Sequence, residues 1–164
     1  TVVYIDLDDL KRINDNYGGH TSGTLALKVL VRTIKRKMQA QVDLDRWAFC
    51  KYGGDEFILA VKGMDPKRLN HILKKVQDEL SDEEGLRVLL QRELERYEDM
   101  YGKLKEFNRD LLMELRKITF SAGIASSHKH FNYIELRQAA NNAEGIAKKK
   151  GKNNIQFCHC GCCS

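Results

Sequence analysis

The chain has 164 residues, of which 42% are hydrophobic and 31% are charged, a composition typical of a globular domain that can bury a core. No apolar run approaches the roughly 18 residues that a membrane span needs, and the chain opens on a strand pattern without a leader, so we expect a cytoplasmic protein that does not enter a membrane. The formal charge of +5 suits binding of polyphosphates, but no basic stripe with interleaved aromatic residues indicates an extended nucleic acid as partner.

The first third of the chain predicts one strand followed by two helices. Residues 2–6 form an apolar run typical of a buried strand. Asp8 or Asp9 is in place to cap a short helix that extends to about Asn16, where glycines interrupt it. Apolar residues then recur with a helical period over 22–41, which predicts a second, longer helix.

A β-hairpin with an acidic turn follows. Residues 45–51 and 56–61 read as its two strands, and two glycines between them lead directly into Asp55 and Glu56. Asp6 closes the first strand, so the three carboxyl groups meet at one edge if these strands are neighbours in a sheet. Carboxylates and substrate phosphates are the usual ligands of Mg²⁺, and the pattern therefore predicts metal-dependent chemistry on a nucleotide.

The second half of the chain predicts helices and strands in alternation. Asp65 and a proline open a helix, residues 117–124 form a strand, 132–150 form the last helix, and 155–157 form a closing strand. The complete order is strand-helix-helix-strand-strand-helix-strand-helix-strand. It indicates an α+β fold of the ferredoxin-like, palm type, with a central, mainly antiparallel sheet of about five strands flanked by helices.

The stretch 83–116 reads as an extended helical insertion within this plan. Apolar residues recur there at alternating spacings of four and three, as in a coiled-coil seam with one polar core position. Two interpretations stay open: helices packed on their own domain, and a coiled coil that makes a dimer. The seam consists of Leu90, Leu94, Tyr97, Tyr101, Leu104, Asn108 and Leu111.

Four of the five cysteines lie at the end of the chain, in a tail over 158–164. Their spacing fits no standard zinc pattern, so a soft-metal site competes with a plain tail of reduced thiols. Cys50 lies in an apolar strand, and we expect it to be an inert core residue.

Five ordered segments resemble the signature segments of one enzyme family, the GGDEF diguanylate cyclases. Gly53-Gly54-Asp55-Glu56-Phe57 is the family's signature itself. Residues 5–15 are similar to its D-x-D-x-F-K-x-I-N-D, 19–24 to its G-H-x-x-G-D, 119–125 to its T-x-S-x-G-[IV]-A, and 147–153 to its A-K-x-x-G-R-N. Because the matches span nearly the whole chain, the resemblance implies one GGDEF-like cyclase domain over 1–157, of a divergent and compact kind.

The resemblance implies an enzyme that condenses two nucleoside triphosphates, GTP or ATP, into a cyclic dinucleotide and releases pyrophosphate, working as a homodimer. Asp6, Asp55 and Glu56 would be the catalytic residues. Asp6, Asp55 and the Leu7 carbonyl would hold Mg²⁺ or Mn²⁺, and Glu56 would neighbour the metal or help to deprotonate the attacking hydroxyl. Metal ions promote such displacements by stabilising the attacking and leaving oxygens.

The same resemblance assigns the substrate contacts. Backbone N–H groups of the Leu7–Leu10 loop, including Asp9, would cradle phosphates, as helix starts do. Lys11, Lys148 and Lys152 match basic positions that contact phosphate. Lys152 stands where the family usually has arginine, so the charge is kept and the bidentate geometry is lost.

Base recognition is where the chain departs from the family pattern. Asn14 matches the asparagine that reads guanine, but Thr24 stands at the position of the family's aspartate. A threonine hydroxyl donates or accepts, whereas a carboxylate only accepts, so we expect relaxed guanine specificity. A branch of the family with a small hydroxyl residue at this position makes a mixed adenine–guanine product.

Two alternatives to an active cyclic-dinucleotide synthase remain. One is a degenerate GGDEF module that binds a nucleotide and regulates a partner, which Thr24 and Lys152 favour. The other is a palm-type synthase of cyclic oligonucleotides, similar to the minimal CRISPR-polymerase-like cyclases of anti-phage defence. Those proteins typically carry G-G-D-D in place of the Gly53–Phe57 signature.

Overall fold

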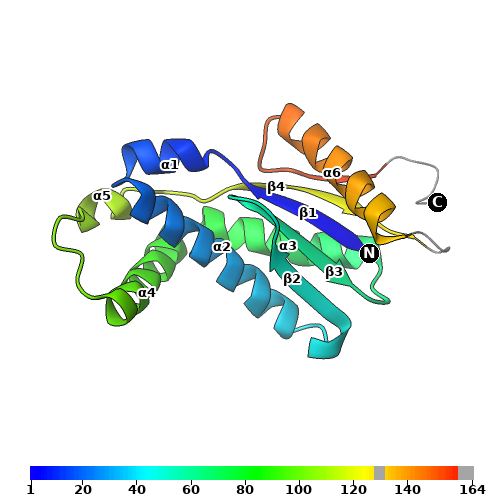
Figure 1. Ribbon diagram of the computed structural model, residues 1–164, viewed down its shortest axis with the longest axis horizontal. Helices are drawn as coiled ribbons and strands as arrows, with labels where there is room; N and C mark the ends of the chain where they lie inside the picture. The colour runs from blue at the N-terminus through cyan, green and yellow to red at the C-terminus, as the bar shows by residue number, and fades with distance from the viewer. Residues whose placement is uncertain (128–131, 159–164) are drawn as a thin grey trace.

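The computed structural model describes residues 1–127 and 132–158, and within them one sheet of five strands is flanked by helices (Figure 1). The strand order is β2-β3-β1-β4-β5, in which β1 lies antiparallel between β3 and β4, and β5 is parallel to β4. The predicted α+β, palm-like fold with a mainly antiparallel sheet is confirmed. The strands are β1 (Val2–Leu7), β2 (Trp47–Lys51), β3 (Glu56–Val61), β4 (Phe120–Ala125) and β5 (Ile155–Phe157).

The helices follow the predicted order with shifted boundaries. The second helix begins two residues earlier than its apolar pattern, at His20, and the strand predicted from residue 117 begins only at Phe120. A single 3-10 turn, Leu44–Arg46, precedes β2. The α-helices are α1 (Leu10–Asn16), α2 (His20–Gln39), α3 (Pro66–Ser81), α4 (Glu83–Tyr101), α5 (Arg109–Met113) and α6 (Tyr133–Lys149).

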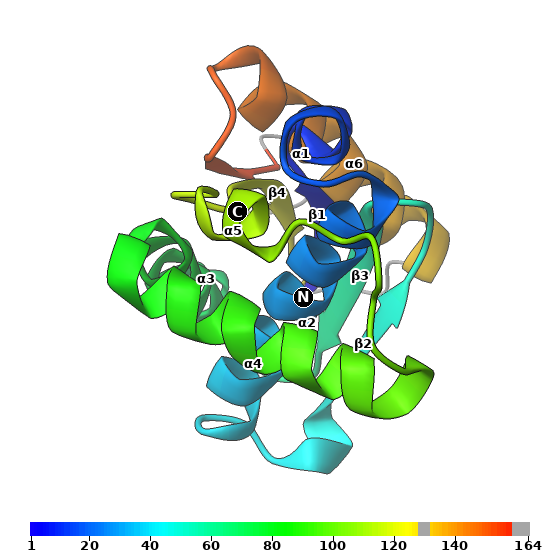
Figure 2. The same cartoon turned by 90° about the vertical axis from the view of Figure 1, so that its left-hand side faces the viewer.

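The sheet separates two layers of different thickness. Figure 2 shows α6 on one side of the sheet and α2, α3 and α4 on the other. Successive side chains of a strand point to opposite faces. Val3, Ile5 and Leu7 of β1 accordingly enter the large core beneath α2, α3 and α4, whereas Val2 and Tyr4 enter a small core beneath α6. Asp6 shares the α6 face with these last two residues.

Gly123 lets α6 approach the sheet closely. A Cβ atom at this position would lie 2.0 Å from the Ala140 carbonyl oxygen and 2.3 Å from the Glu144 nitrogen, both of which belong to the α6 backbone. Real Cβ atoms do not approach backbone that closely, so any larger residue would force α6 away from β4. The glycine thereby fixes the height of α6 above the sheet edge at which Asp6 lies.

The prediction of helix throughout 83–116 is wrong over 102–108 and 114–116, because α4 ends at Tyr101 and the short helix α5 spans only Arg109–Met113. Gly102 adopts φ 87°, a left-handed conformation that ends α4. Asn108 is not a polar core position of a seam, because its side chain accepts a hydrogen bond from the Leu111 N–H at 3.0 Å and caps the short helix α5. Leu112, and not Leu111, is buried in the core.

α4 packs against its own domain, which is the first of the two interpretations of this stretch. Leu86, Leu90 and Leu94 belong to the same core cluster as residues of α2 and α3. A continuous coiled-coil seam through 111 does not form. The apolar period of α4 is therefore explained by burial within the domain.

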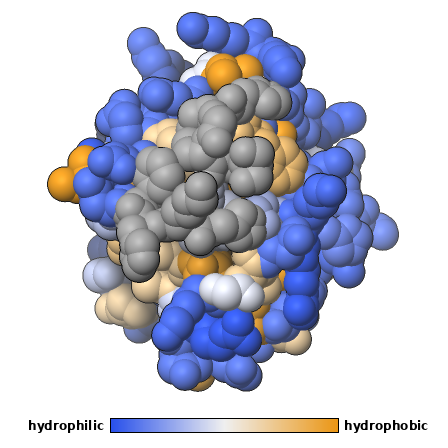
Figure 3. All heavy atoms as spheres, turned by 90° about the vertical axis from the view of Figure 1, so that its right-hand side faces the viewer, coloured by the Kyte–Doolittle hydropathy of each residue, from blue (hydrophilic) through white to orange (hydrophobic). Residues whose placement is uncertain are grey.

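Cys50 is exposed, so the prediction of a core cysteine is wrong. Its strand, β2, lies at one edge of the sheet, where Cys50 pairs with Ile58 of β3. α6 packs over β1, β4 and β5, so it does not cover Cys50. Of the cysteine-rich tail, 159–164 lies outside the described residues. Figure 3 views the molecule from the right-hand side of Figure 1. On that face, hydrophobic residues gather toward the middle, within a hydrophilic rim. None of the described helices is long and apolar enough to cross a membrane.

Candidate active site

The end of β1 and the hairpin turn meet at one edge of the sheet, as the sequence predicts. Asp6 pairs with Glu56 on β3 and with Ser121 on β4. The Leu7 N–H donates a hydrogen bond to the Asp55 carbonyl oxygen at 3.1 Å. The strand pairing therefore brings Asp6, Asp55 and Glu56 together from two segments about fifty residues apart.

The turn is closed by two hydrogen bonds to one carbonyl. The Tyr52 and Gly53 N–H groups both donate to the Glu56 carbonyl oxygen, at 2.8 and 3.2 Å. A Cβ atom at Gly53 would lie 2.2 Å from Glu56 Oε2, so the glycine leaves room for this carboxylate to fold back over the turn. The side chain of Glu56 is thus held beside the turn that carries Asp55.

A cluster of charged side chains on the α6 face joins Asp6 to two residues of that helix. Lys148 Nζ lies 2.9 Å from Asp6 Oδ2 and 3.1 Å from Glu144 Oε1. Asp6 is only 6% exposed. Burial, together with the charges of Asp55 and Glu144, raises the pKa of Asp6 to about 6 against the opposing pull of Lys148. Burial also raises the pKa of Glu144.

Glu144 is a site residue that sequence reasoning missed. It precedes Lys148 by four residues, so both lie on one face of α6. That face otherwise carries the small buried residues Ala140, Ala143 and Ala147. A carboxylate among small apolar residues, one turn from a lysine in the signature segment, was the available signal.

Tyr4 is hydrogen-bonded to the side chain of Glu56. Burial first, and then a side-chain hydrogen bond to Glu56, raise the pKa of Tyr4. Its ring meets the ring of Tyr52 edge-on, with centroids 5.7 Å apart. Arg137 of α6 in turn hydrogen-bonds the Tyr52 hydroxyl and lies over its ring. Glu56 is therefore backed by a chain of contacts that reaches α6.

Neither Asp8 nor Asp9 caps α1 with its side chain, which corrects that prediction. Asp8 is buried and accepts hydrogen bonds from Ser121 Oγ at 2.8 Å and from the Asn153 N–H at 2.9 Å. Asp9 occupies the cap position with φ 56° but makes no side-chain cap bond. Asp8 therefore ties the end of β1 to β4 and to the loop after α6.

Asp9 is paired with Lys152, one of the predicted phosphate contacts. Lys152 Nζ lies 2.5 Å from Asp9 Oδ1, and this hydrogen bond lowers the pKa of Asp9. Both side chains are more than 40% exposed. An exposed pair of this kind contributes little to stability, so Lys152 can exchange Asp9 for another anion at small cost.

A cavity of about 410 Å³ opens beside the acidic turn. Four of the residues predicted to bind substrate or metal line it, namely Leu10, Lys11, Asn14 and Asp55. Sequence reasoning did not single out Asp15, Gly19 and His20, which complete the lining.

Asn14 lines this cavity, and its amide oxygen is turned toward Gly23 of α2. Its Oδ1 is buried and has no hydrogen-bond partner among the described residues. A Cβ atom at Gly23 would lie 2.0 Å from this same atom, so the glycine permits the tight crossing of α1 and α2 that fixes the amide. A buried acceptor without a partner is costly in a folded protein, and close packing against α2 holds this one in place.

Thr24 does not line the cavity of Asn14. It is exposed on α2, one helical turn after His20, and lines an adjoining hollow of about 430 Å³ together with Lys28, Lys51 and Phe57. The structure thus separates the two residues that the sequence analysis assigns to one base. His20 and Thr24 lie on the same side of α2, so the two hollows adjoin along that helix.

The donor atoms at this edge are of the kind that hard divalent cations prefer. Asp6 and Asp55 offer carboxylate oxygens, and the charge of Asp55 raises the pKa of Asp6. In the described part of the chain, no three His, Cys, Asp or Glu side chains are grouped as a complete metal site. The two carboxylates fit Mg²⁺ where substrate phosphates supply further ligands.

Comparison with known proteins agrees with this arrangement. The family model "Diguanylate cyclase, GGDEF domain" matches residues 1–89. The chain is 31% identical over 158 residues to the diguanylate cyclase DosC of Shigella sonnei and of Escherichia coli, which covers 96% of this chain and 28% of each relative. The chain therefore spans about a quarter of the length of these curated relatives.

Solved structures show the same fold. The GGDEF domain of DgcB from Caulobacter crescentus, in complex with c-di-GMP, superposes with a TM-score of 0.70 at 21% identity, covering 97% of this chain and 75% of that one. The active GGEEF domain of a diguanylate cyclase from Vibrio cholerae gives a TM-score of 0.67 at 17% identity, covering 98% and 83%. The family match over more than half of the chain establishes that this protein belongs to the GGDEF diguanylate cyclase family.

Proposed function

We propose that this domain condenses two nucleoside triphosphates into a cyclic dinucleotide and releases pyrophosphate. The observation that carries the proposal is the cavity that Lys11, Asn14 and Asp55 line together, at the sheet edge where Asp6 is buried. A phosphate-binding cation, a base-reading amide and a carboxylate pair are the groups that nucleotidyl transfer needs in one place. Nucleoside triphosphates as substrates favour a cytoplasmic location.

Asp6, Asp55 and the Leu7 carbonyl would hold Mg²⁺ or Mn²⁺. When bound there, the ion stabilises charge on the attacking and leaving oxygens of the displacement. Lys148, whose Nζ lies 2.9 Å from Asp6 Oδ2 and 3.1 Å from Glu144 Oε1, would bind a triphosphate oxygen from this position.

The protein's own groups position the nucleotide and receive the proton. Lys11, with backbone N–H groups around Asp9 and Leu10, binds phosphate, and Lys152 can leave Asp9 to join it. The 3′-oxygen of one nucleotide bonds to the α-phosphorus of the other, the bond to pyrophosphate breaks, and Glu56 accepts the hydroxyl proton. Tyr4 orients the Glu56 carboxylate through their hydrogen bond.

One cavity of about 410 Å³ has room for one nucleotide, so the reaction requires two copies of the domain. We infer a homodimer in which each copy presents one nucleoside triphosphate to the other. Two such displacements, related by symmetry, close the ring.

Base choice in this proposal is relaxed. Asn14 would contact the base from the cavity beside the acidic turn, and the neutral hydroxyl of Thr24 would contact it from the adjoining hollow along α2. A neutral hydroxyl discriminates less strongly than a carboxylate between the Watson–Crick edges of guanine and adenine. The expected products include a mixed adenine–guanine dinucleotide.

The test is mass spectrometry of the products formed with Mg²⁺ or Mn²⁺ and with ATP and GTP, singly and mixed. A cyclic dinucleotide is the expected product, and its bases report the base choice. Longer cyclic oligonucleotides would support the palm-type synthase instead. Bound nucleotide without any pyrophosphate release would overturn the proposal and identify a regulatory nucleotide-binding module.

A further inference from the structure

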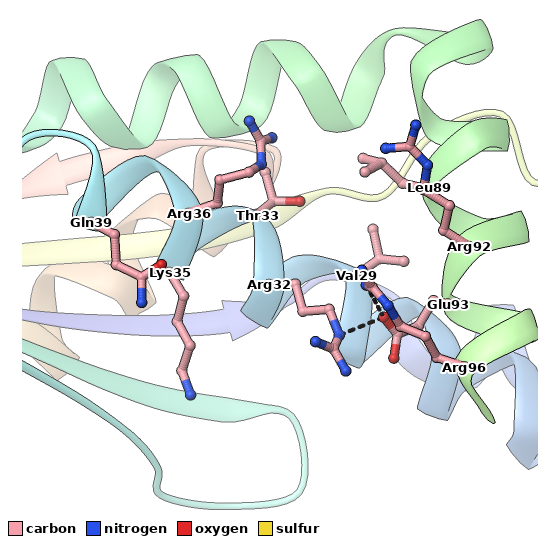
Figure 4. A pocket seen from close by; sticks show the side chains of 10 residues that line it. All are labelled: Val29, Arg32, Thr33, Lys35, Arg36, Gln39, Leu89, Arg92, Glu93 and Arg96. Carbon is pink, nitrogen blue, oxygen red and sulfur yellow. Dashed lines mark hydrogen bonds and ion pairs between the residues drawn. The ribbon is translucent and has the colours of Figure 1, made fainter. Parts of the chain in front are cut away.

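A second cavity of about 410 Å³ lies between α2 and α4, and it shares no lining residue with the cavity at the acidic turn. Figure 4 shows that residues of α2 form one wall and residues of α4 the other. None of its lining residues belongs to the signature segments of the family. The lining consists of Val29, Arg32, Thr33, Lys35, Arg36, Gln39, Leu89, Arg92, Glu93 and Arg96.

Five cationic side chains surround this cavity, and their charge is only partly compensated. Arg32 Nε and Arg96 Nη1 both contact Glu93 Oε2, at 2.6 and 3.5 Å. Arg36 pairs with Glu79 of α3. Lys35 and Arg92 form no ion pair within residues 1–127 and 132–158. The cavity therefore has a positive excess that attracts a small anion.

Two buried polar atoms at the cavity have no partner. Thr33 is 1% exposed and its Oγ1 makes no hydrogen bond in the described part of the chain, although a helical threonine commonly bonds a carbonyl of the preceding turn. Glu93 is also 1% exposed, and its Oε1 is likewise unpaired. Figure 4 shows the Thr33 hydroxyl directed toward the space between the helices, with the guanidinium groups of Arg36 and Arg92 on either side.

We propose that this cavity is a binding site for a phosphate-type anion. Guanidinium groups bind phosphate oxygens with paired, charge-assisted hydrogen bonds, which Arg36 and Arg92 can supply from opposite walls. The Thr33 hydroxyl donates to another phosphate oxygen. Glu93 Oε1, an acceptor, is satisfied by the O–H of a hydrogen phosphate, so the one carboxylate of the cavity selects a protonated oxyanion.

Two sources of this chemistry exist, namely free inorganic phosphate or pyrophosphate, and the phosphate end of a nucleotide. The cavity is the size of sites that take small molecules. An anion held by both helices would join α4 to α2. It would therefore raise the thermal stability of the domain, by an amount that grows with the logarithm of the ligand concentration above Kd.

The experiment is a calorimetric titration with pyrophosphate in EDTA, accompanied by amide chemical-shift mapping of the same titration. The variants are Arg92→Gln, Thr33→Val and, as a matched control, Arg116→Gln. Arg116 is exposed and lies outside the cavity, so its substitution makes the same change of charge elsewhere. We expect roughly tenfold weaker binding for Arg92→Gln and Thr33→Val, the usual effect of losing one hydrogen bond to a charged group, and no change for Arg116→Gln.

Thr33→Val also separates binding from folding. The hydroxyl has no partner within the protein, so its replacement by an isosteric methyl group leaves the melting temperature equal or higher without ligand. The ligand-induced rise in melting temperature is nevertheless expected to shrink. A variant that melts normally and binds pyrophosphate as tightly as the parent would overturn the assignment.

Shift mapping locates the binding. Perturbed amides within 32–36 and 89–96 are expected, whereas perturbation confined to 10–14 would place all binding at the acidic turn and contradict the proposal. Equal weakening in Arg92→Gln and Arg116→Gln would reveal only general charge attraction, which also contradicts it. Inorganic phosphate, pyrophosphate, a nucleoside diphosphate and the nucleoside are compared as ligands: tighter binding of the diphosphate than of pyrophosphate identifies a nucleotide, and equal binding identifies the free anion.

Discussion

The two faces of the sheet differ in what they contribute. The face toward α2, α3 and α4 is a thick apolar core, to which β1 contributes Val3, Ile5 and Leu7. The face toward α6 has only a small apolar cluster, beside which the buried carboxylates Asp6 and Glu144 share the half-exposed Lys148. One strand serves both faces because its side chains alternate. Most of the apolar core is thus on one face and the buried carboxylates Asp6 and Glu144 are on the other, with Asp6 held in place by the anchored residues on either side of it.

The largest expected effect comes from a substitution at the sheet edge where Asp6, Asp55 and Glu56 meet. Asp55→Ala is expected to reduce pyrophosphate release by roughly a thousandfold or more, because a metal-binding carboxylate and its electrostatic contribution are lost. The side chain lies in a turn outside the apolar core, so the urea midpoint is expected to change little.

Asp78→Ala is the matched control, since this carboxylate is exposed on α3 and distant from the turn in the fold. It is expected to retain full activity. Retained turnover in Asp55→Ala would contradict the assignment of Asp55 and, with it, the separation of chemistry from stability.

The opposite effect is expected from the thick face. Leu90 of α4 is fully buried in the large core, so Leu90→Ala is expected to lower the free energy of unfolding by about 3 kcal/mol. Turnover per folded molecule and the identity of the product are expected to stay unchanged, as measured well below the unfolding midpoint. A changed product would show that the helical layer shapes the active site, and the contrast between the faces would fail.

Gly123 tests whether the packing of α6 on the sheet contributes to both stability and turnover. Gly123→Ala places a methyl group against the α6 backbone, and overpacking of this kind is expected to cost about 2 kcal/mol. Because α6 carries Glu144 and Lys148, the same substitution is expected to reduce turnover as well, which Leu90→Ala does not.

Gly145→Ala is the control within the same helix. A Cβ atom there meets nothing within 4 Å, and alanine is a better helix former, so stability is expected to rise by about 0.5–1 kcal/mol. Urea unfolding and pyrophosphate release measured on both variants provide the comparison. If Gly123→Ala retains full turnover, α6 does not position the catalytic groups.

Strands and helices with a regular apolar period could be predicted from the sequence. A break in that period, or the place of a strand within the sheet, could not. Adjacent apolar strands with acidic ends sufficed to bring Asp6 and Asp55 to one edge. Gly102 within the heptad pattern was a signal against one continuous helix, but the pattern could not show that Leu112 would replace Leu111 in the core after the break. Cys50 is exposed because its strand lies at an edge of the sheet, and the apolar pattern of a strand does not show where in the sheet that strand lies.

Contacts distant in sequence were the least predictable part of the site. Asp8 is bonded to Ser121 and Asn153, 113 and 145 residues away along the chain, and nothing local distinguishes it from a helix cap. The pairing of Glu144 with Asp6 through Lys148 depends on the rotation and height of α6, which Gly123 fixes. Tertiary packing determines these contacts, so the local sequence could not predict them.

The smallest expected effect concerns base choice and asks whether the thick layer contributes to specificity. Thr24 lies on the exposed side of α2, whose other side packs into the large core. Thr24→Asp supplies a charged acceptor for the two N–H donors of guanine, and we expect the preference for GTP over ATP to rise about tenfold.

Competition between GTP and ATP in one reaction, with products resolved by mass, measures this shift. Lys28 and Lys51 line the same hollow and compensate the added charge, so the fold is expected to tolerate it. Thr24→Val, which removes the hydroxyl without adding charge, separates loss of a hydrogen bond from gain of a carboxylate. An unchanged ratio in both variants would mean that the hollow of Thr24 does not receive the base. Specificity would then rest with Asn14 and the cavity beside the acidic turn.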